Sequence, residues 1–184
     1  MSDDPDGWKT EHRLSHLMSY PYVSFLIQQA AQGAQKQISA EKFLAVVGGS
    51  IGAATGMPLL GTMFQAGSVL AQLYGAMGVK VQKSRRASYQ RPIGQVIVAL
   101  LCALARGGYS VNQALQDSSG CAIKAHLPSS WLSWKGTISA AVAGDANRTY
   151  LEVGIHIPGQ AYDWGRSNKI LVSMFSEIER DIAY

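Results

Sequence analysis

The sequence predicts an α+β fold, with an N-terminal glycine-rich helical hairpin followed by a C-terminal α-β-β-β-α domain of two layers. Residues 43–79 contain no charged side chain, and small residues recur in them at intervals of four. Further along, the hydrophobic period changes to two over three stretches, with a helical pattern before and after them. We therefore divide the chain into a tail and amphipathic helix (1–38), a glycine-zipper hairpin (39–80), a basic linker (81–91) and an α+β domain (92–184).

Composition excludes several classes of protein. The net charge of +4 and the absence of a long Lys/Arg stripe argue against a nucleic-acid partner. Two cysteines, Cys102 and Cys121, are too few for a disulfide framework. The acidic start, MSDDPDGW, lacks the basic region of a secretory signal, so we expect a cytoplasmic N-terminus.

Two helices are predicted before the neutral stretch. The first, 11–18, carries His12 and His16 four residues apart, a spacing that could share a metal ion. We find no third ligand nearby and interpret them as surface histidines. The second follows Pro21, and its apolar and glutamine residues separate onto two faces. Such a helix could lie on a membrane, on another subunit or in an ordinary core.

The neutral stretch predicts close helix packing. Its small residues would share one side of each helix, where they allow two backbones to approach: Gly48, Gly52, Gly56, Gly67, Ala71 and Gly75. Pro58 would break the stretch into one arm ending near Met57 and a second arm ending near Val79.

Three interpretations of this stretch remain open. In the first, the two arms cross a membrane, although the first arm is short for a bilayer core of about 30 Å. In the second, both helices are buried in a soluble core or oligomer. In the third, AVVGGSIGAATG forms a dinucleotide-binding turn, but no acidic residue follows about 20 residues later.

A basic cluster follows the neutral stretch. Lys80, Lys83, Arg85 and Arg86 have no acidic neighbour and could contact anionic lipid or another anion. Basic residues on both flanks favour a hairpin in the cytoplasmic membrane with both ends on the cytoplasmic side. The simpler alternative is a solvated linker in a cytoplasmic protein.

The C-terminal elements follow from periodicity. Pro92 and the Gly107-Gly108 pair bound a predicted helix. Alternation predicts strands over 123–127, 138–142 and 149–157, which we expect to form an antiparallel meander with one apolar and one polar face. A last amphipathic helix begins near Ser167, with Glu177, Glu179, Arg180 and Asp181 expected to face solvent. Both helices would cover the apolar face.

Residues 92–182 resemble a small α+β domain of uncharacterised bacterial proteins. The resemblance is carried by Ser133-Trp134-Lys135-Gly136, by YLEVGIHI and by Asp163-Trp164-Gly165-Arg166. Lys135 interrupts the Trp-Gly pair of that domain. The resemblance implies the fold of this domain and no activity.

We expect no catalytic centre, cofactor or metal. The titratable candidates lie on predicted strands or turns and match no nucleophile–base–acid arrangement: Cys121, Lys124, His126, Glu152, His156 and Asp163. Lys124 and His126 could still face Glu152 and His156 on an adjacent strand as an acid–base group.

The sequence therefore favours a non-enzymatic, membrane-associated protein that oligomerises, as a scaffold subunit or a pore. Its expected partners are further copies of itself, anionic lipids and other protein subunits. The alternatives are a soluble structural or binding subunit whose glycine-rich helices pack in an oligomer and, last, a small enzyme using the polar sheet face.

Overall fold

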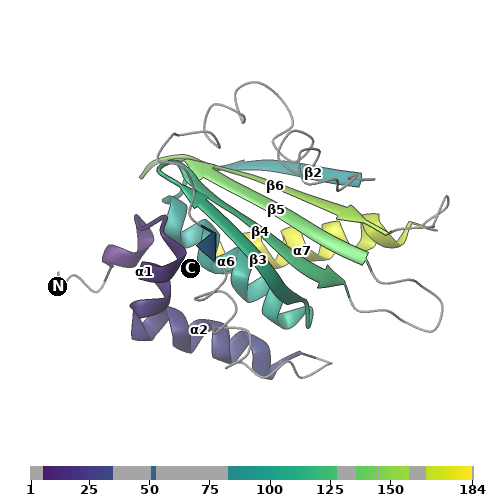
Figure 1. The fold of residues 1–184 in the computed structure, drawn as a ribbon, viewed down its shortest axis with the longest axis horizontal. Helices are drawn as coiled ribbons and strands as arrows, with labels where there is room; N and C mark the ends of the chain where they lie inside the picture. Colours follow the sequence, from purple (N-terminus) through teal and green to yellow (C-terminus); the bar gives the residue numbers. More distant parts are fainter. Residues whose placement is uncertain are drawn as a thin grey trace.

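The structure, a computed structural model, describes residues 6–34, 51–52, 83–127, 136–144, 146–157 and 165–183. It confirms the α+β class (Figure 1). Its helices are η1 (Gly7–Lys9), α1 (Leu14–Ser19), α2 (Pro21–Gln32), α6 (Ile93–Arg106) and α7 (Arg166–Ile182). Its strands are β1 (Ile51–Gly52), β2 (Lys83–Tyr89), β3 (Ser110–Asp117), β4 (Gly120–Leu127), β5 (Gly136–Gly144) and β6 (Thr149–His156).

The strands form one sheet in the order β1-β3-β4-β5-β6-β2. Strands β3 to β6 make the predicted kind of antiparallel meander, and β4, β5 and β6 correspond to the three strands predicted from alternation. The two remaining strands close the edges: β2 runs antiparallel to β6, and the two-residue β1 runs parallel to β3. The meander is therefore wider than predicted.

The sequence of strand β3 does not alternate between apolar and polar residues, so its pattern does not predict a strand. The pairing of β3 with β4 shifts between Val111 and Gln113, an irregularity of the β-bulge kind. A bulge changes which face the following residues occupy, so the apolar residues on either side of it fall out of step. Val111 and Ala114, three positions apart, are both buried in the core.

Residues 83–89, within the basic linker expected at 81–91, form strand β2, although most of its residues are exposed as expected. An edge strand exposes much of its surface to water, so charged residues on both of its faces are compatible with a strand. Arg86 pairs with the Glu152 carboxylate of β6, with 3.2 Å between Nη2 and Oε2. The Arg85 guanidinium lies 4.7 Å from the centre of the Phe175 ring of α7.

The helices form two layers on one side of the sheet (Figure 1). Helices α6 and α7 contact the sheet and each other, and α2 packs on the outer side of α6. Nearly every residue of α6 from Ile93 to Ala105 is buried, since it has neighbours on all sides. Its predicted bounds, between Pro92 and Gly107, are confirmed.

Gly94 explains how the N-terminal segment reaches this core. A Cβ atom at this position would collide with the backbone carbonyl oxygens of Trp8, Lys9 and Glu11. Glycine therefore lets the segment 8–11 lie directly against the first turn of α6. Trp8, Leu14, Leu17, Val23 and Ile27 consequently belong to the same hydrophobic core as α6.

The transmembrane hairpin finds no support. In the described ranges, no helix combines the length and the apolar character needed to cross a membrane. A helix through Ile51 and Gly52 is wrong, because these two residues pair with β3 as a strand. The remainder of 43–79, including the Pro58 turn, lies outside the described residues.

The ion pair between β2 and β6 generates a first prediction. Arg86→Met keeps much of the side-chain length but removes the charge facing Glu152, whose side chain has no exposed surface. Arg86 itself is 44% exposed, so water moderates the loss, and we expect the free energy of unfolding to fall by about 1–3 kcal/mol in urea denaturation.

Arg91→Met is the matched control, because Arg91 is exposed and its change should stay within about 0.5 kcal/mol. Adding Glu152→Gln to Arg86→Met should recover part of the stability, because no buried charge then remains at this position. Equal stability of Arg86→Met and Arg91→Met would show that the ion pair contributes nothing.

Candidate functional site

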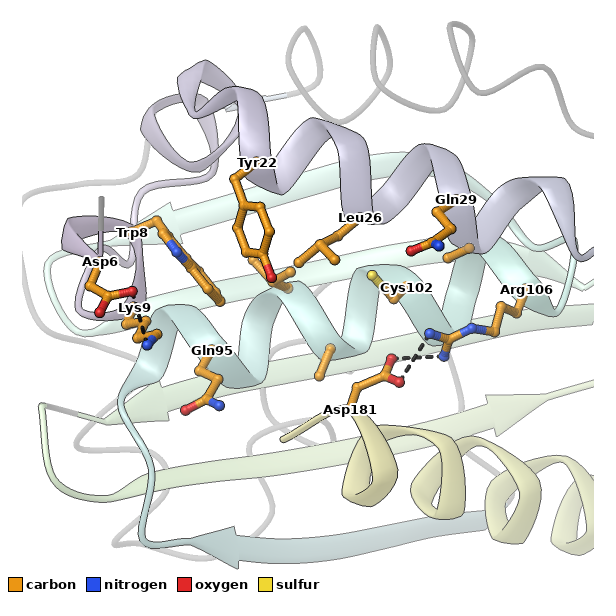
Figure 2. Close-up of a pocket in the computed structure, with 13 residues that line it drawn as sticks. Asp6, Trp8, Lys9, Tyr22, Leu26, Gln29, Gln95, Cys102, Arg106 and Asp181 are labelled. Carbon is orange, nitrogen blue, oxygen red and sulfur yellow. Dashed lines mark hydrogen bonds and ion pairs between the residues drawn. The ribbon is translucent and has the colours of Figure 1, made fainter. Parts of the chain in front are cut away.

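A groove of about 670 Å³ lies between α2 and α6, with η1 at one end and the last turn of α7 at the other (Figure 2). Binding pockets for small molecules usually measure about 300–1,000 Å³ and combine apolar walls with a few polar groups. The groove has this character. Its lining residues are Asp6, Trp8, Lys9, Tyr22, Leu26, Gln29, Ala30, Gln95, Val98, Ala99, Cys102, Arg106 and Asp181.

Both long walls are single faces of helices. On α6, Gln95, Ala99, Cys102 and Arg106 follow one another at intervals of three or four residues. On α2, Tyr22, Leu26 and Ala30 do the same. Such residues stack along one side of a helix, so the two faces oppose each other along the length of the groove.

The apolar part of the groove is made by small and medium side chains. Ala30, Val98, Ala99 and Cys102 leave the space that larger residues at these positions would fill. Burial raises the pKa of the Cys102 thiol to about 12, with a smaller contribution from the charge of Asp181. Because the thiolate is scarce at neutral pH, Cys102 acts here as an apolar residue and not as a nucleophile.

Charged pairs occupy the two ends. Lys9 Nζ lies 3.0 Å from Asp6 Oδ1 beyond the indole of Trp8. At the other end Arg106 donates to Asp181 Oδ1 at 3.0 Å and to Glu177 Oε2 at 3.1 Å. The expectation that Glu177 and Asp181 face solvent is wrong, because both point to Arg106. Each end therefore presents a cation that is already neutralised.

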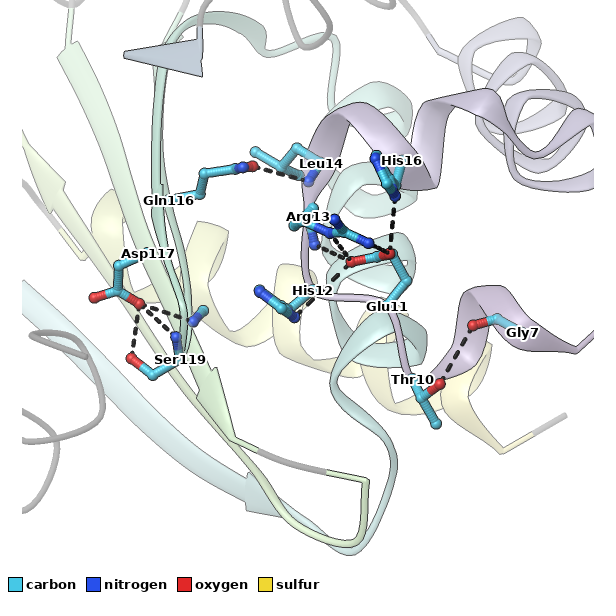
Figure 3. Close-up of polar contacts among 11 residues, drawn as sticks. Gly7, Thr10, Glu11, His12, Arg13, Leu14, His16, Gln116, Asp117 and Ser119 are labelled. Atoms are coloured by element: carbon cyan, nitrogen blue, oxygen red, sulfur yellow. Dashed lines mark hydrogen bonds and ion pairs between the residues drawn. The ribbon is translucent and has the colours of Figure 1, made fainter. Parts of the chain in front are cut away.

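Glu11, three residues after Trp8, lies at the centre of a cluster of polar contacts (Figure 3). Its carboxylate accepts hydrogen bonds from the Arg13 backbone N–H at 2.8 Å and from the Arg13 guanidinium at 3.0 and 2.8 Å. His16 Nδ1 lies 3.2 Å from it, and His12 Nδ1 lies 3.9 Å from it. Gln116 of β3 fixes the next residue, because its Oε1 accepts the N–H of Leu14 at 3.1 Å.

Glu11 is a partner of both histidines, which their spacing in the sequence does not reveal. The i, i+4 spacing brings His12 and His16 close to one carboxylate. Its two oxygens already accept hydrogen bonds from Arg13. Across the ranges that the structure describes, no group of three or more His, Cys, Asp or Glu residues is arranged to hold a metal ion. The cluster is thus a local anchor of the N-terminal segment.

The residues singled out from the sequence lie elsewhere. Of the predicted helix-packing residues, Gly52 belongs to β1, and Gly48, Gly56, Gly67, Ala71 and Gly75 lie outside the described residues. Of the predicted lipid-contacting cations, Arg85 and Arg86 have partners within the fold and Lys83 begins β2. Lys80 lies outside the described residues.

The catalytic candidates do not come together. Strand β5 separates β4 from β6, and Glu152 is also offset by two residues from the row of Lys124, so the two residues lie on the same face but about 12 Å apart. The alternative of an acid–base group on adjacent strands is therefore wrong, because β4 and β6 are not neighbours. The Asn112 carboxamide lies 3.2 Å from His126 Nε2. Burial raises the pKa of the Cys121 thiol to about 12. Asp163 lies outside the described residues.

None of the groove residues had been proposed as a site. The intervals of three or four among Gln95, Ala99, Cys102 and Arg106 are visible in the sequence and mark one face of a helix. What the sequence does not tell is that α2, about 70 residues earlier, lies opposite that face.

The Glu11 cluster generates a second prediction. Partial burial by itself raises the pKa of Glu11, but the hydrogen bonds and charge of Arg13 outweigh it and lower the pKa from 4.5 to about 2. A lowered pKa stabilises the fold above pH 4.5, and this stabilisation is lost as the pH falls from 4.5 through 2.

Glu11→Gln should therefore unfold at a lower urea concentration than the wild type at neutral pH, and the difference should close as the pH approaches 2. Glu179→Gln, at an exposed position of α7, is the control and should show no such convergence. A difference between wild type and Glu11→Gln that stays constant with pH would contradict the assignment.

Comparisons of the chain with protein-family models, with curated proteins and with solved structures give no match, so its function has to be argued from the groove and the fold.

Proposed function

We propose that this protein is a non-enzymatic binding protein whose ligand occupies the groove between α2 and α6. The observation that carries the proposal is a groove of about 670 Å³ whose small apolar side chains are flanked by ion pairs at both ends. Cores normally fill such space, because a void forfeits packing contacts. The small residues along the two facing helix surfaces therefore indicate that a ligand fills this space.

The lining specifies the chemical class of that ligand. The cations at both ends are paired with carboxylates, so the groove offers no uncompensated charge to an ion. The carboxamides of Gln29 and Gln95 supply hydrogen-bonding groups beside the apolar wall. We expect a neutral, elongated small molecule with an apolar body and one or two polar substituents.

Trp8 and Tyr22 form the aromatic end of the groove. Their ring centroids are 5.9 Å apart and the rings are inclined at 49°. Trp8 is buried, whereas 56% of Tyr22 is exposed. A ligand that reaches this end would cover Tyr22 and change the surroundings of the Trp8 indole, which provides an optical signal of binding.

A second candidate function is association with a membrane surface through α2. Phe25 is 58% exposed and follows Tyr22 by three residues, so both aromatic rings lie on the same side of the helix. Exposed aromatic residues on an amphipathic helix insert at the boundary between lipid head groups and acyl chains. Assembly through the glycine-rich stretch stays a prediction, because that stretch lies almost entirely outside the described residues.

The binding proposal predicts saturable uptake of a neutral apolar probe. N-phenyl-1-naphthylamine should increase its fluorescence on binding and should quench Trp8 emission. Ala99→Phe places a ring in the groove and should weaken binding by about tenfold or more, a loss of about 1.4 kcal/mol. Titration of the probe at fixed protein concentration measures both effects.

Val172→Phe is the control, because Val172 is already 48% exposed on α7 and does not line the groove. The thermal midpoints of both variants establish that they are folded. Comparison with Trp8→Phe identifies the part of the tryptophan emission that comes from Trp8 in the groove. Non-saturable uptake, or equal weakening by Ala99→Phe and Val172→Phe, would overturn the binding proposal.

The membrane candidate predicts co-sedimentation with vesicles of phosphatidylcholine and phosphatidylglycerol. Tyr22→Ser combined with Phe25→Ser should reduce the bound fraction, since it removes the exposed aromatic surface of α2. Val172→Ser is the control on another exposed helix face. If wild type and the double variant sediment equally, α2 does not carry membrane association.

A further inference from the structure

The edge of the sheet at β2 is exposed and carries positive charge. Strand β2 is the terminal strand, and β6 is its one neighbour among the described strands (Figure 1). Its first four residues, Lys83 to Arg86, are all exposed. A terminal strand pairs through half of its backbone N–H and C=O groups. The other half point away from β6, toward the place that a further strand would take.

This edge lacks most of the features that prevent a strand from pairing. Natural edge strands are commonly protected by short length, by bulges, by proline or by charge. The seven residues of β2 pair with β6 in an uninterrupted register, from Lys83 opposite Ile155 to Tyr89 opposite Thr149. The strand contains no proline. Of the four features, β2 therefore shows charge alone.

The charges of β2 oppose pairing with a second copy of this chain. Full antiparallel overlap of two β2 strands would set Arg86 opposite its equivalent, and parallel overlap would set every cation opposite its equivalent. Like charges directly opposite each other destabilise a strand pair, whereas opposite charges stabilise it. The same cations that reject a second copy consequently favour an acidic partner strand.

The cations lie on both faces of the strand. Successive side chains point to opposite faces, so Arg86 lies on the face of Glu152 and Arg85 lies on the other, against Phe175 of α7. Lys83 shares the face of Arg85. The contacts with Glu152 and Phe175 hold both guanidinium groups beside the edge. A partner strand brings its own alternating side chains level with both faces, so its acidic residues would meet both sets of cations.

We propose that the exposed edge of β2 binds an acidic peptide segment, which adds to the sheet as a further strand. The outward backbone groups of β2 fix the direction and register of the peptide, and the cations select its acidic side chains. Strand addition of this kind is a recurring mode of peptide recognition. No residue that lines the groove between α2 and α6 belongs to β2, so this site is independent of the ligand proposed for the groove.

Rhodamine-labelled peptides test the proposal by fluorescence anisotropy with the full chain. The sequence Thr-Val-Glu-Glu-Val-Glu-Val-Thr sets its glutamates opposite Arg86, Arg85 and Lys83 in an antiparallel pair, and the reversed sequence does so in a parallel pair. At least one of the two should bind saturably. Replacing its glutamates by glutamine should weaken binding about tenfold or more, because the opposite charges are lost.

N-methylation of the peptide distinguishes strand addition from simple attraction between charges. A strand pairs with one neighbour through the N–H groups of every second residue. Two further peptides therefore carry N-methyl groups, one at its odd-numbered residues and the other at its even-numbered residues. One of them should keep its affinity and the other should lose about tenfold or more. Equal affinities of these two peptides would overturn the proposal.

Variants of the protein locate the site. Lys83→Gln combined with Arg85→Gln should weaken binding of the peptide about tenfold or more, while Arg86 is kept for its ion pair. Lys169→Gln combined with Arg180→Gln is the matched control, because it removes the same charge from exposed positions of α7. Thermal midpoints establish that both double variants are folded.

Three results would contradict strand addition at β2. The first is equal weakening by the two double variants, which would place the peptide elsewhere. The second is the absence of saturable binding by either acidic peptide. The third is binding of phosphatidylglycerol vesicles or of single-stranded DNA that requires Lys83 and Arg85 when neither peptide binds, which would assign the edge to lipid or to nucleic acid.

Discussion

The fold depends on the burial of α6 on all sides. The sheet covers one side of this helix, α7 another and α2 a third. A helix that is apolar around its whole circumference is stable only when every face has a neighbour. The N-terminal segment is therefore part of the core. Gly94 provides the close contact that joins this segment to the first turn of α6.

The same constraint produces the groove. Helix α2 packs against α6, and its Val23 and Ile27 are fully buried in the same hydrophobic core. Beside this contact, Ala30, Ala99 and Cys102 are too small to fill the remaining space. The interface is thus well packed around Val23 and Ile27. Beside them, the small side chains leave an elongated space with a fixed shape. Such a preformed shape reduces the entropic cost of binding a ligand.

In the middle of the sheet, along β5, residues on both faces are buried. Helices α6 and α7 cover the core face with large aliphatic and aromatic residues. On the opposite face Glu152 lies between Ala141 of β5 and Arg86 of β2, and Arg86 meets its charge at 3.2 Å. An antiparallel sheet usually leaves one face solvated.

Local sequence by itself determined the elements whose signals are periodic and uninterrupted. Helix α6 was bounded by Pro92 and Gly107, and β4 to β6 followed from alternation, because these patterns reflect one buried face along one element. Tertiary structure alone decided the rest. The bulge in β3 broke its alternation, β2 became a strand because β6 offered an edge to pair with, and Asp181 turned inward because Arg106 lay opposite. The groove could not be predicted for the same reason. It is a property of two helix faces brought together from distant parts of the chain, and nothing in either face alone identifies its partner.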